Sequence, residues 1–411
     1  MFDKLRIPVS ETNPLLRVWV SLCIGFPAIA MVSIAGANLL LPLTILGFFF
    51  LPHTFSFPKN HLLWSILLGF IGWSLLTTAI SPYGAHWGSW FEELSTILAI
   101  LPGIIVGSSL TRIQRSYRIV AVVLLLVAGY AVWQFFFGWD IVRGWQPLRF
   151  QFHRYHAVGL QDFHLTYAGV IAVCLPLAAA VWSTAIGSFV AVSGVAAVMA
   201  TMARSMMGAM GVSAILLGIL GKKKLRILAV TIIVALLVLP QTVFQAAGER
   251  FARGVAINSE KAGEGDPTRR YLWLTSLAII KDHPIAGVGN NRWDEAFFTY
   301  KIPFDGYSST AHPHNDFLST AVEYGIPGAL IFATFWFAFL ILLVKRPTDE
   351  PNEMREYRIA GLAGILTILI GGLVQCYLTD AEVSLQVWFL TGTLISMIST
   401  QQMVMIRSDN R

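Results

Sequence analysis

The chain has 411 residues, of which 55% are hydrophobic and only 13% are charged, and its formal net charge is +6. A soluble protein of this length could not cover so much apolar surface, so a soluble globular fold is excluded and lipid must surround much of the chain. Membrane lipid is therefore an expected partner, and no nucleic acid is expected.

Apolar runs of about 20 residues, the length that crosses a bilayer core, recur along the chain. They predict an all-α polytopic membrane protein with about twelve transmembrane helices, with eleven or thirteen as alternatives. The first span follows a polar start without a cleavage site and is expected to be an anchor. The predicted spans are 16–34, 36–52, 62–80, 94–109, 118–137, 163–182, 185–202, 206–221, 225–244, 326–344, 358–376 and 384–403.

Basic residues in short loops predict the orientation of the chain. If the N-terminus is cytoplasmic and the spans alternate, the inner segments hold 17 of the 29 Lys and Arg residues. Eight of the others lie in the one long loop after residue 244, where the rule has little force. We therefore expect both termini in the cytoplasm and the long loop on the outer side.

Four arginines go against this rule. Arg143, Arg149 and Arg154 crowd the outer loop between the predicted spans 118–137 and 163–182. Arg204 lies in a very short outer turn, where a charge at membrane depth costs on the order of 3 kcal/mol. Snorkelling to lipid phosphates is the alternative for each arginine, but the short turn leaves Arg204 little room for it.

The long polar stretch 245–325 divides the chain into nine helices (1–244), this loop, and three helices with a tail (326–411). Asp266 and Pro267 predict the start of a helix that runs to about Lys281. Its expected apolar stripe is Arg269, Trp273, Leu277 and Ile280. Arg270 enters the same side at another angle, and one of the two arginines is expected to form an ordinary ion pair, for example Arg270 with Asp266.

The sharpest local pattern in this loop is His312-Pro-His-Asn-Asp316. Pro313 predicts the start of a helix and Gly325 its end, which places His314 on the apolar face near the helix N-terminus. A helix N-terminus and nearby cations lower the pKa of an imidazole, so His314 is a candidate proton acceptor; a packed structural histidine is the alternative.

The glycines in Gly287-Val-Gly-Asn-Asn291 are only superficially like a nucleotide-binding loop. No strand precedes them and no helix follows in a βαβ unit, so a turn after the preceding helix is the better interpretation.

These motifs together resemble a known family. A short turn with Thr-x-x-Arg (Thr201 to Arg204) precedes the long loop, which holds an arginine four residues before an aromatic (Arg269 to Trp273). His-Pro-x-x-Gly-x-Gly follows at 283–289, then His-Asn at 314–315 with Gly-x-x-Gly at 325–328. In order, spacing and topology, the set is similar to the O-antigen ligase and polymerase superfamily of bacterial inner membranes.

The resemblance implies a C-type glycosyltransferase architecture with its active site on the periplasmic face. The donor would be a glycan on undecaprenyl diphosphate and the acceptor lipid A–core. The diphosphate-binding residues would be Arg204 and Arg269, with Arg270 as the alternative within the doublet, and the essential histidine would be His314. His312, Asn315, Arg143, Arg149 and Arg154 are further candidate substrate-binding residues.

Elementary chemistry agrees with that implication. The departing diphosphate needs its charge neutralised, and the sequence has no Asp-x-Asp to hold a metal for this. Arginine is forked, permanently charged and suited to phosphate oxygens. The accepting hydroxyl needs a base, for which His314 is the candidate. We therefore expect no cofactor, no metal and an inverting transfer.

Two rival functions stay open at this point. A polymerase of the same superfamily would use the same donor but extend another lipid-linked glycan. A membrane transporter, from a different class, would place polar residues at mid-membrane on broken helices with an internal repeat. Here the spans carry few charges, and the chemically suggestive residues gather on one face, which favours an enzyme.

Overall fold

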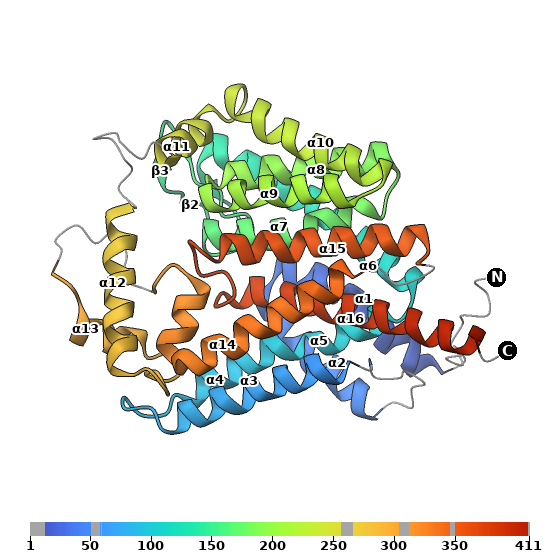
Figure 1. The fold of residues 1–411 in the computed structure, drawn as a ribbon. Coiled ribbons are helices and arrows are strands. Elements are labelled where there is room, and N and C mark those ends of the chain that lie inside the picture. The colour runs from blue at the N-terminus through green and yellow to red at the C-terminus, as the bar shows by residue number, and fades with distance from the viewer. Residues whose placement is uncertain are drawn as a thin grey trace.

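The computed structural model describes residues 13–50, 58, 60–255, 266–303, 312–345 and 350–409, and almost all of its regular structure is helical (Figure 1). The helices of the first half are α1 (Pro14–Val32), α2 (Ile34–Phe50), α3 (His61–Ala79), α4 (Trp87–Leu98), α5 (Ile100–Gly107), α6 (Leu110–Phe137), α7 (His164–Ala180), α8 (Thr184–Ala200), α9 (Arg204–Leu220) and α10 (Lys223–Val238). Those of the second half are η2 (Leu239–Gln241), α11 (Gln245–Val255), α12 (Asp266–Asp282), α13 (Trp293–Tyr300), α14 (Asp316–Val344), α15 (Asn352–Gly371) and α16 (Ala381–Asp409).

Two minimal antiparallel ladders lie in the loop between α6 and α7. β1 (Trp139–Asp140) pairs with β2 (Gln146–Pro147), and β3 (Phe150–Gln151) pairs with β4 (Arg154–Tyr155). No other strands occur in the described part of the chain. Each strand has only two residues, so the pairs stabilise a loop and do not form a sheet layer.

Seven helical segments of the described chain are long and apolar enough to cross a membrane: α1, α3, α4 with α5, α6, α10 with η2, α14 and the first part of α16. Shorter apolar helices are α2, α7, α8 and α9. An all-α polytopic membrane protein is therefore confirmed. The number of twelve spans stays a prediction, and α15 overlaps the predicted span 358–376.

Small residues let the helices approach closely inside this bundle. Gly103 and Gly107 lie one turn apart on α5, and a Cβ on either would come within 2.1 Å of a carbonyl oxygen of α16, that of Phe389 or Thr393. Gly392 makes the reciprocal approach to Ile100. In lipid the hydrophobic effect does not drive helices together, so this close backbone packing is what joins α5 to α16.

The polar segment after α10 lies at one end of the helix bundle. Figure 1 shows α12 and α13 at this end, and the C-terminal end of α16 at the opposite end. The predicted helix 266–281 is confirmed as α12. Its buried side chains are Thr268, Leu272, Thr275, Ser276 and Ile279. Leu277 is 55% exposed, so the predicted stripe through Leu277 is wrong by part of a turn.

The predicted helix from Pro313 to Gly325 is wrong at its start and confirmed at its end, where the non-helical Gly325 (φ 70°, ψ 179°) separates two helices within α14. The helix α14 begins at Asp316 with Asn315 as its N-cap, because the Asn315 side chain accepts the backbone N–H of Leu318. His314 precedes the helix with a left-handed φ of 54°, so it does not lie on the helix face. At Gly325 the backbone kinks, with φ 70°, and α14 continues to Val344.

The His-Pro-x-x-Gly-x-Gly segment packs across this kink. Backbone N–H groups of Val288 and Gly289 donate to the carbonyls of Val322 and Glu323, and that of Ile326 donates to Pro284. A Cβ at Gly325 would come within 2.1 Å of the Ile285 oxygen. The predicted turn at 287–291 is confirmed, and its Gly287 allows a close approach of two backbones, since a Cβ there would come within 2.5 Å of the Glu323 oxygen.

Candidate active site

The segment 312–315 holds the two histidines between α12 and α14. The backbone N–H of His314 donates to Nδ1 of His312 at 3.2 Å, and the two rings lie 4.3 Å apart. On the other side, Nδ1 of His314 lies 2.6 Å from Oε1 of Gln375. The left-handed backbone of His314 is thus held by its neighbours, as strained residues at functional sites commonly are.

Both imidazoles are electrostatically biased toward the neutral form. Burial, the neighbouring His314 and the charge of Arg269 lower the pKa of His312 to about 3. Burial and the charge of Arg269 also lower the pKa of His314, against the opposing effect of its contact with Gln375. A histidine with a lowered pKa is neutral at pH 7 and able to accept a proton.

The helix α12 brings Arg269 to the histidines. The indole N–H of Trp273, one turn further along, donates to the carbonyl of Pro313 at 2.9 Å and fixes α12 against the histidine segment. Arg269 is half-buried and acts on the pKa values of His312, His314 and Tyr377, whereas Arg270 is exposed. Of the two adjacent arginines, Arg269 is therefore the one whose charge acts on the histidines.

The turn before α9 presents Arg204 as the first residue of that helix. Thr201 shapes this turn, since its hydroxyl donates to the carbonyl of Val198 at 2.6 Å and accepts the N–H of Ala203 at 3.1 Å. Met202 has a left-handed φ of 56°. The sequence showed the Thr-x-x-Arg spacing, and the structure adds that the threonine braces the turn.

The segment 372–380, between α15 and α16, connects the arginine turn with the histidines. Its Gln375 contacts His314, and its Tyr377 hydroxyl lies 2.9 Å from that of Ser205, the neighbour of Arg204. The buried carboxylate of Asp316 accepts the N–H groups of Tyr377 at 3.2 Å and Leu378 at 3.0 Å. Sequence reasoning missed this segment, because no motif marks it.

Of the predicted site residues, the structure joins His312, His314 and Arg269 through contacts and charge, and Arg204 through Ser205 and Tyr377. Asn315 caps α14, and its Nδ2 donates to the carbonyl of Leu373 at 2.9 Å. The oxygen and the nitrogen of the Asn315 amide are thus both engaged in structural hydrogen bonds.

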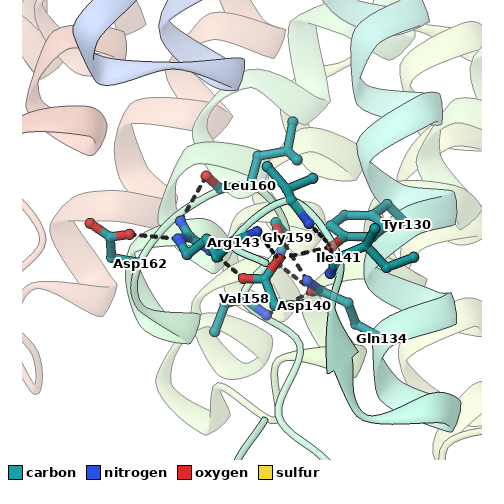
Figure 2. A network of polar contacts seen from close by, with 10 residues as sticks. Tyr130, Gln134, Asp140, Ile141, Arg143, Val158, Gly159, Leu160 and Asp162 are labelled. Carbon is teal, nitrogen blue, oxygen red and sulfur yellow. Dashed lines mark hydrogen bonds and ion pairs between the residues drawn. The ribbon is translucent and has the colours of Figure 1, made fainter. Parts of the chain in front are cut away.

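Arg143 belongs to a separate polar network in the loop after α6 (Figure 2). Its guanidinium contacts Asp140 at 2.6 Å, Asp162 at 2.8 Å and the carbonyl of Leu160 at 3.0 Å. Asp140 also accepts the hydroxyl proton of Tyr130. These contacts favour a structural role for Arg143.

The other two arginines of this loop are exposed. Arg154 lies over the ring of Phe136, 5.4 Å from its centroid, and donates to the carbonyl of His153 at 2.9 Å. The carbonyl of Arg149 accepts the N–H of His156. Because both residues are exposed, an anionic group of a substrate can reach them, as their predicted role in substrate binding requires.

The fold and the site together define a polytopic α-helical membrane protein with a cationic, histidine-containing site at one end of its bundle. Residues 189–333 match the sequence profile of a family described as O-antigen ligase. This match confirms the resemblance found from the motifs, and the matched residues include Arg204, Arg269 and His314. The family supports an enzyme of the ligase or polymerase type. A comparison with curated proteins finds no match.

Proposed function

We propose that this protein is an O-antigen ligase. It transfers a glycan from undecaprenyl diphosphate to a sugar hydroxyl of lipid A–core, in lipopolysaccharide biosynthesis, and it works by metal-independent, inverting transfer. The observation that carries the proposal is His314, whose imidazole pKa is lowered by burial and by the charge of Arg269, in a segment that matches the O-antigen ligase family.

The arginines account for the donor. Arg204 and Arg269 bind the diphosphate, whose negative charge grows as the glycosidic bond breaks, and Arg270 supplies further positive charge at the exposed side of α12. Forked guanidinium groups suit this task because each can donate two hydrogen bonds to phosphate oxygens.

His314 accounts for the acceptor. The accepting hydroxyl oxygen attacks the anomeric carbon from the face opposite the diphosphate, and its proton passes to the imidazole. The bond from the anomeric carbon to the diphosphate oxygen breaks, and undecaprenyl diphosphate leaves with the electron pair. Attack opposite the leaving group inverts the anomeric configuration. The lowered pKa of His314 supports this role, since only a neutral imidazole accepts the proton.

The proposed location is the bacterial inner membrane, with both termini in the cytoplasm and the site facing the periplasm. Support comes from the arrangement in Figure 1, where α12 and α13 lie at the end of the bundle opposite the C-terminal end of α16. It also comes from the basic residues of the short loops, which favour a cytoplasmic N-terminus. The polyprenyl tail of the donor stays in the bilayer, which explains why the enzyme is built as a membrane bundle.

Reconstitution of the purified protein tests the proposal. Undecaprenyl-diphosphate glycan and lipid A–core are supplied together, and the products are separated by gel electrophoresis. A ligase adds glycan to the core. Growth of the lipid-linked glycan alone would instead identify a polymerase, and the absence of both products would reject the family's reaction for this chain.

Single variants then test the residues. Arg204→Ala, Arg269→Ala and His314→Ala are each expected to abolish transfer while the protein remains in the membrane. Arg115→Ala and His61→Ala are matched controls, because both side chains are exposed and belong to other parts of the bundle. Transfer that is lost on adding a chelator and restored by metal would contradict the metal-independent mechanism.

A further inference from the structure

One buried polar side chain at the site, that of Gln375, takes no direct part in the proposed reaction. Gln375 lies between α15 and α16 and is 1% exposed, and its Oε1 is 2.6 Å from Nδ1 of His314. We propose that Gln375 is a positioning residue that holds His314 in the Nδ1-protonated tautomer and so leaves Nε2 as the proton acceptor. The catalytic part of this inference rests on the proposed function.

The tautomer follows from the hydrogen-bonding capacity of the two groups. An amide oxygen only accepts, so its contact with Nδ1 forms when Nδ1 carries the proton. A neutral imidazole has a single N–H, so Nε2 then has a free lone pair. Without this partner, the proton would be shared between the two nitrogens, and a fraction of the molecules would have no base at the reacting position.

Gln375 is fastened in place by the residues that follow His314. The carbonyl of Gly372 accepts the N–H of Asp316 at 2.8 Å, and that of Leu373 accepts Nδ2 of Asn315 at 2.9 Å. Beyond Gln375, the Asp316 carboxylate accepts the N–H groups of Tyr377 and Leu378. The segment is thus tied to 315–316 on both sides of Gln375, which fixes the distance between the amide and the imidazole.

The charged groups around His314 explain why its partner is an amide rather than a carboxylate. Arg269 on α12 is the charged group that acts on both imidazoles, and His314 also acts on that of His312. The carboxyl group of Asp316 contacts the loop backbone, and that of Asp380 accepts from Thr166 at 2.7 Å. An amide orients the ring without adding a negative charge that would raise the pKa of His314 and repel the diphosphate.

Diethyl pyrocarbonate labelling of His314, followed by mass spectrometry across pH, tests the contact independently of transfer. The full-length protein is used in lipid nanodiscs, and the reagent reacts with the neutral ring. Gln375→Glu places a carboxylate at Nδ1, and we expect it to raise the pH midpoint of labelling by roughly 1–3 units. Gln375→Leu should lower the midpoint. The control Gln386→Leu removes another buried glutamine, bonded to Pro27, and should leave it unchanged.

Transfer kinetics test the catalytic consequence. Gln375→Leu should lower kcat about 10- to 100-fold with little change in the KM of the donor, as is usual when the partner that orients a functional histidine is lost. Glutamate also accepts from Nδ1–H, so Gln375→Glu should recover most of the kcat above its raised midpoint and lose it below. Gln386→Leu should keep the wild-type kcat per folded protein.

Two results would overturn the inference: an unchanged labelling midpoint in Gln375→Glu, or a kcat for Gln375→Glu as low as that of Gln375→Leu at every pH. An equally low kcat in both variants would mean that the Gln375 amide donates a hydrogen bond to Nδ1 of His314. A shifted midpoint in a protein without any transfer activity would instead reject the proposed function and leave the contact between Gln375 and His314 standing.

Discussion

The hydroxyl groups of Ser205 and Tyr377 lie 2.9 Å apart, although the two residues are 172 positions apart in the chain. Ser205 follows Arg204 at the start of α9, and Tyr377 lies two residues after Gln375, the partner of His314. This contact therefore sets the position of the arginine turn relative to the histidine segment.

Tyr377→Phe tests that coupling. We expect the KM of the lipid-linked donor to rise about 2- to 10-fold, the effect of one lost neutral hydrogen bond of about 0.5–1.5 kcal/mol. Tyr167→Phe is the matched control, since it removes a buried hydroxyl that donates to Val127 within the bundle. Steady-state kinetics in nanodiscs give both values, and an equal change in the two variants would argue against a specific role for the Ser205 contact.

Gly325→Ala tests the docking of the 284–289 segment on the kink of α14. A side chain at φ 70° is strained, and its Cβ would meet the Ile285 oxygen at 2.1 Å. We expect a loss of at least about 2 kcal/mol in the free energy of unfolding. In the control, Gly129→Ala in α6, the Cβ meets nothing within 4 Å, and a gain of about 0.5–1 kcal/mol is expected. Comparable unfolding curves for the two variants would contradict the close approach.

The lowered pKa of His312 makes the stability of the segment 312–316 sensitive to acid. The pKa of His312 falls from 6.5 to about 3, mainly because of burial. Since this folded-state pKa lies below that of an exposed histidine, the stabilisation is complete above about pH 6.5 and is lost as the pH falls toward 3. Hydrogen-exchange protection of 312–316, corrected for intrinsic rates, should drop at least about 10-fold between pH 7 and pH 4.

His312→Asn provides the control for this acid effect. Its amide oxygen can accept the His314 N–H, as Nδ1 does, but it does not titrate. The variant should keep its protection at pH 4. Equal acid sensitivity in the wild type and in His312→Asn would assign the effect to another group.

Arg143→Ala separates a structural from a substrate-binding role. It removes the ion-pair partner of Asp140, whose side chain is only 3% exposed, and should reduce stability by about 1.5–3 kcal/mol. Adding Asp140→Asn should recover part of this loss, because the buried charge is then removed as well. If Arg143 has only this structural role, the double variant should have an acceptor KM close to the wild-type value. A KM that stays high in the stable double variant would show that Arg143 binds the acceptor.

The apolar runs predicted most of the membrane helices, because lipid forces each span to satisfy its own backbone hydrogen bonds. The ends of elements were less predictable. Pro313 suggested a helix start, but the side chain of Asn315 caps the helix two residues later and His314 takes a left-handed conformation. The predicted helix end at Gly325 is confirmed, because the backbone there is non-helical and a second helix of α14 starts beyond it.

The site was predictable only where its residues form local patterns. Arg204, Arg269 and His314 each belong to a short motif. Gln375 and Tyr377 lie in a segment without one, and their contacts bridge 61 and 172 positions of the chain. Such long-range partners depend on how α9, α14 and α15 pack, and periodicity along the chain carries no information about that.

A cryo-EM map of the protein with undecaprenyl diphosphate is the most direct test of the shared donor site. We predict that the side chains of Arg204 and Arg269 both contact the diphosphate, with Nε2 of His314 facing the position that the anomeric carbon would occupy. A diphosphate bound elsewhere, or held by only one of these arginines with His314 turned away from it, would contradict the proposed mechanism.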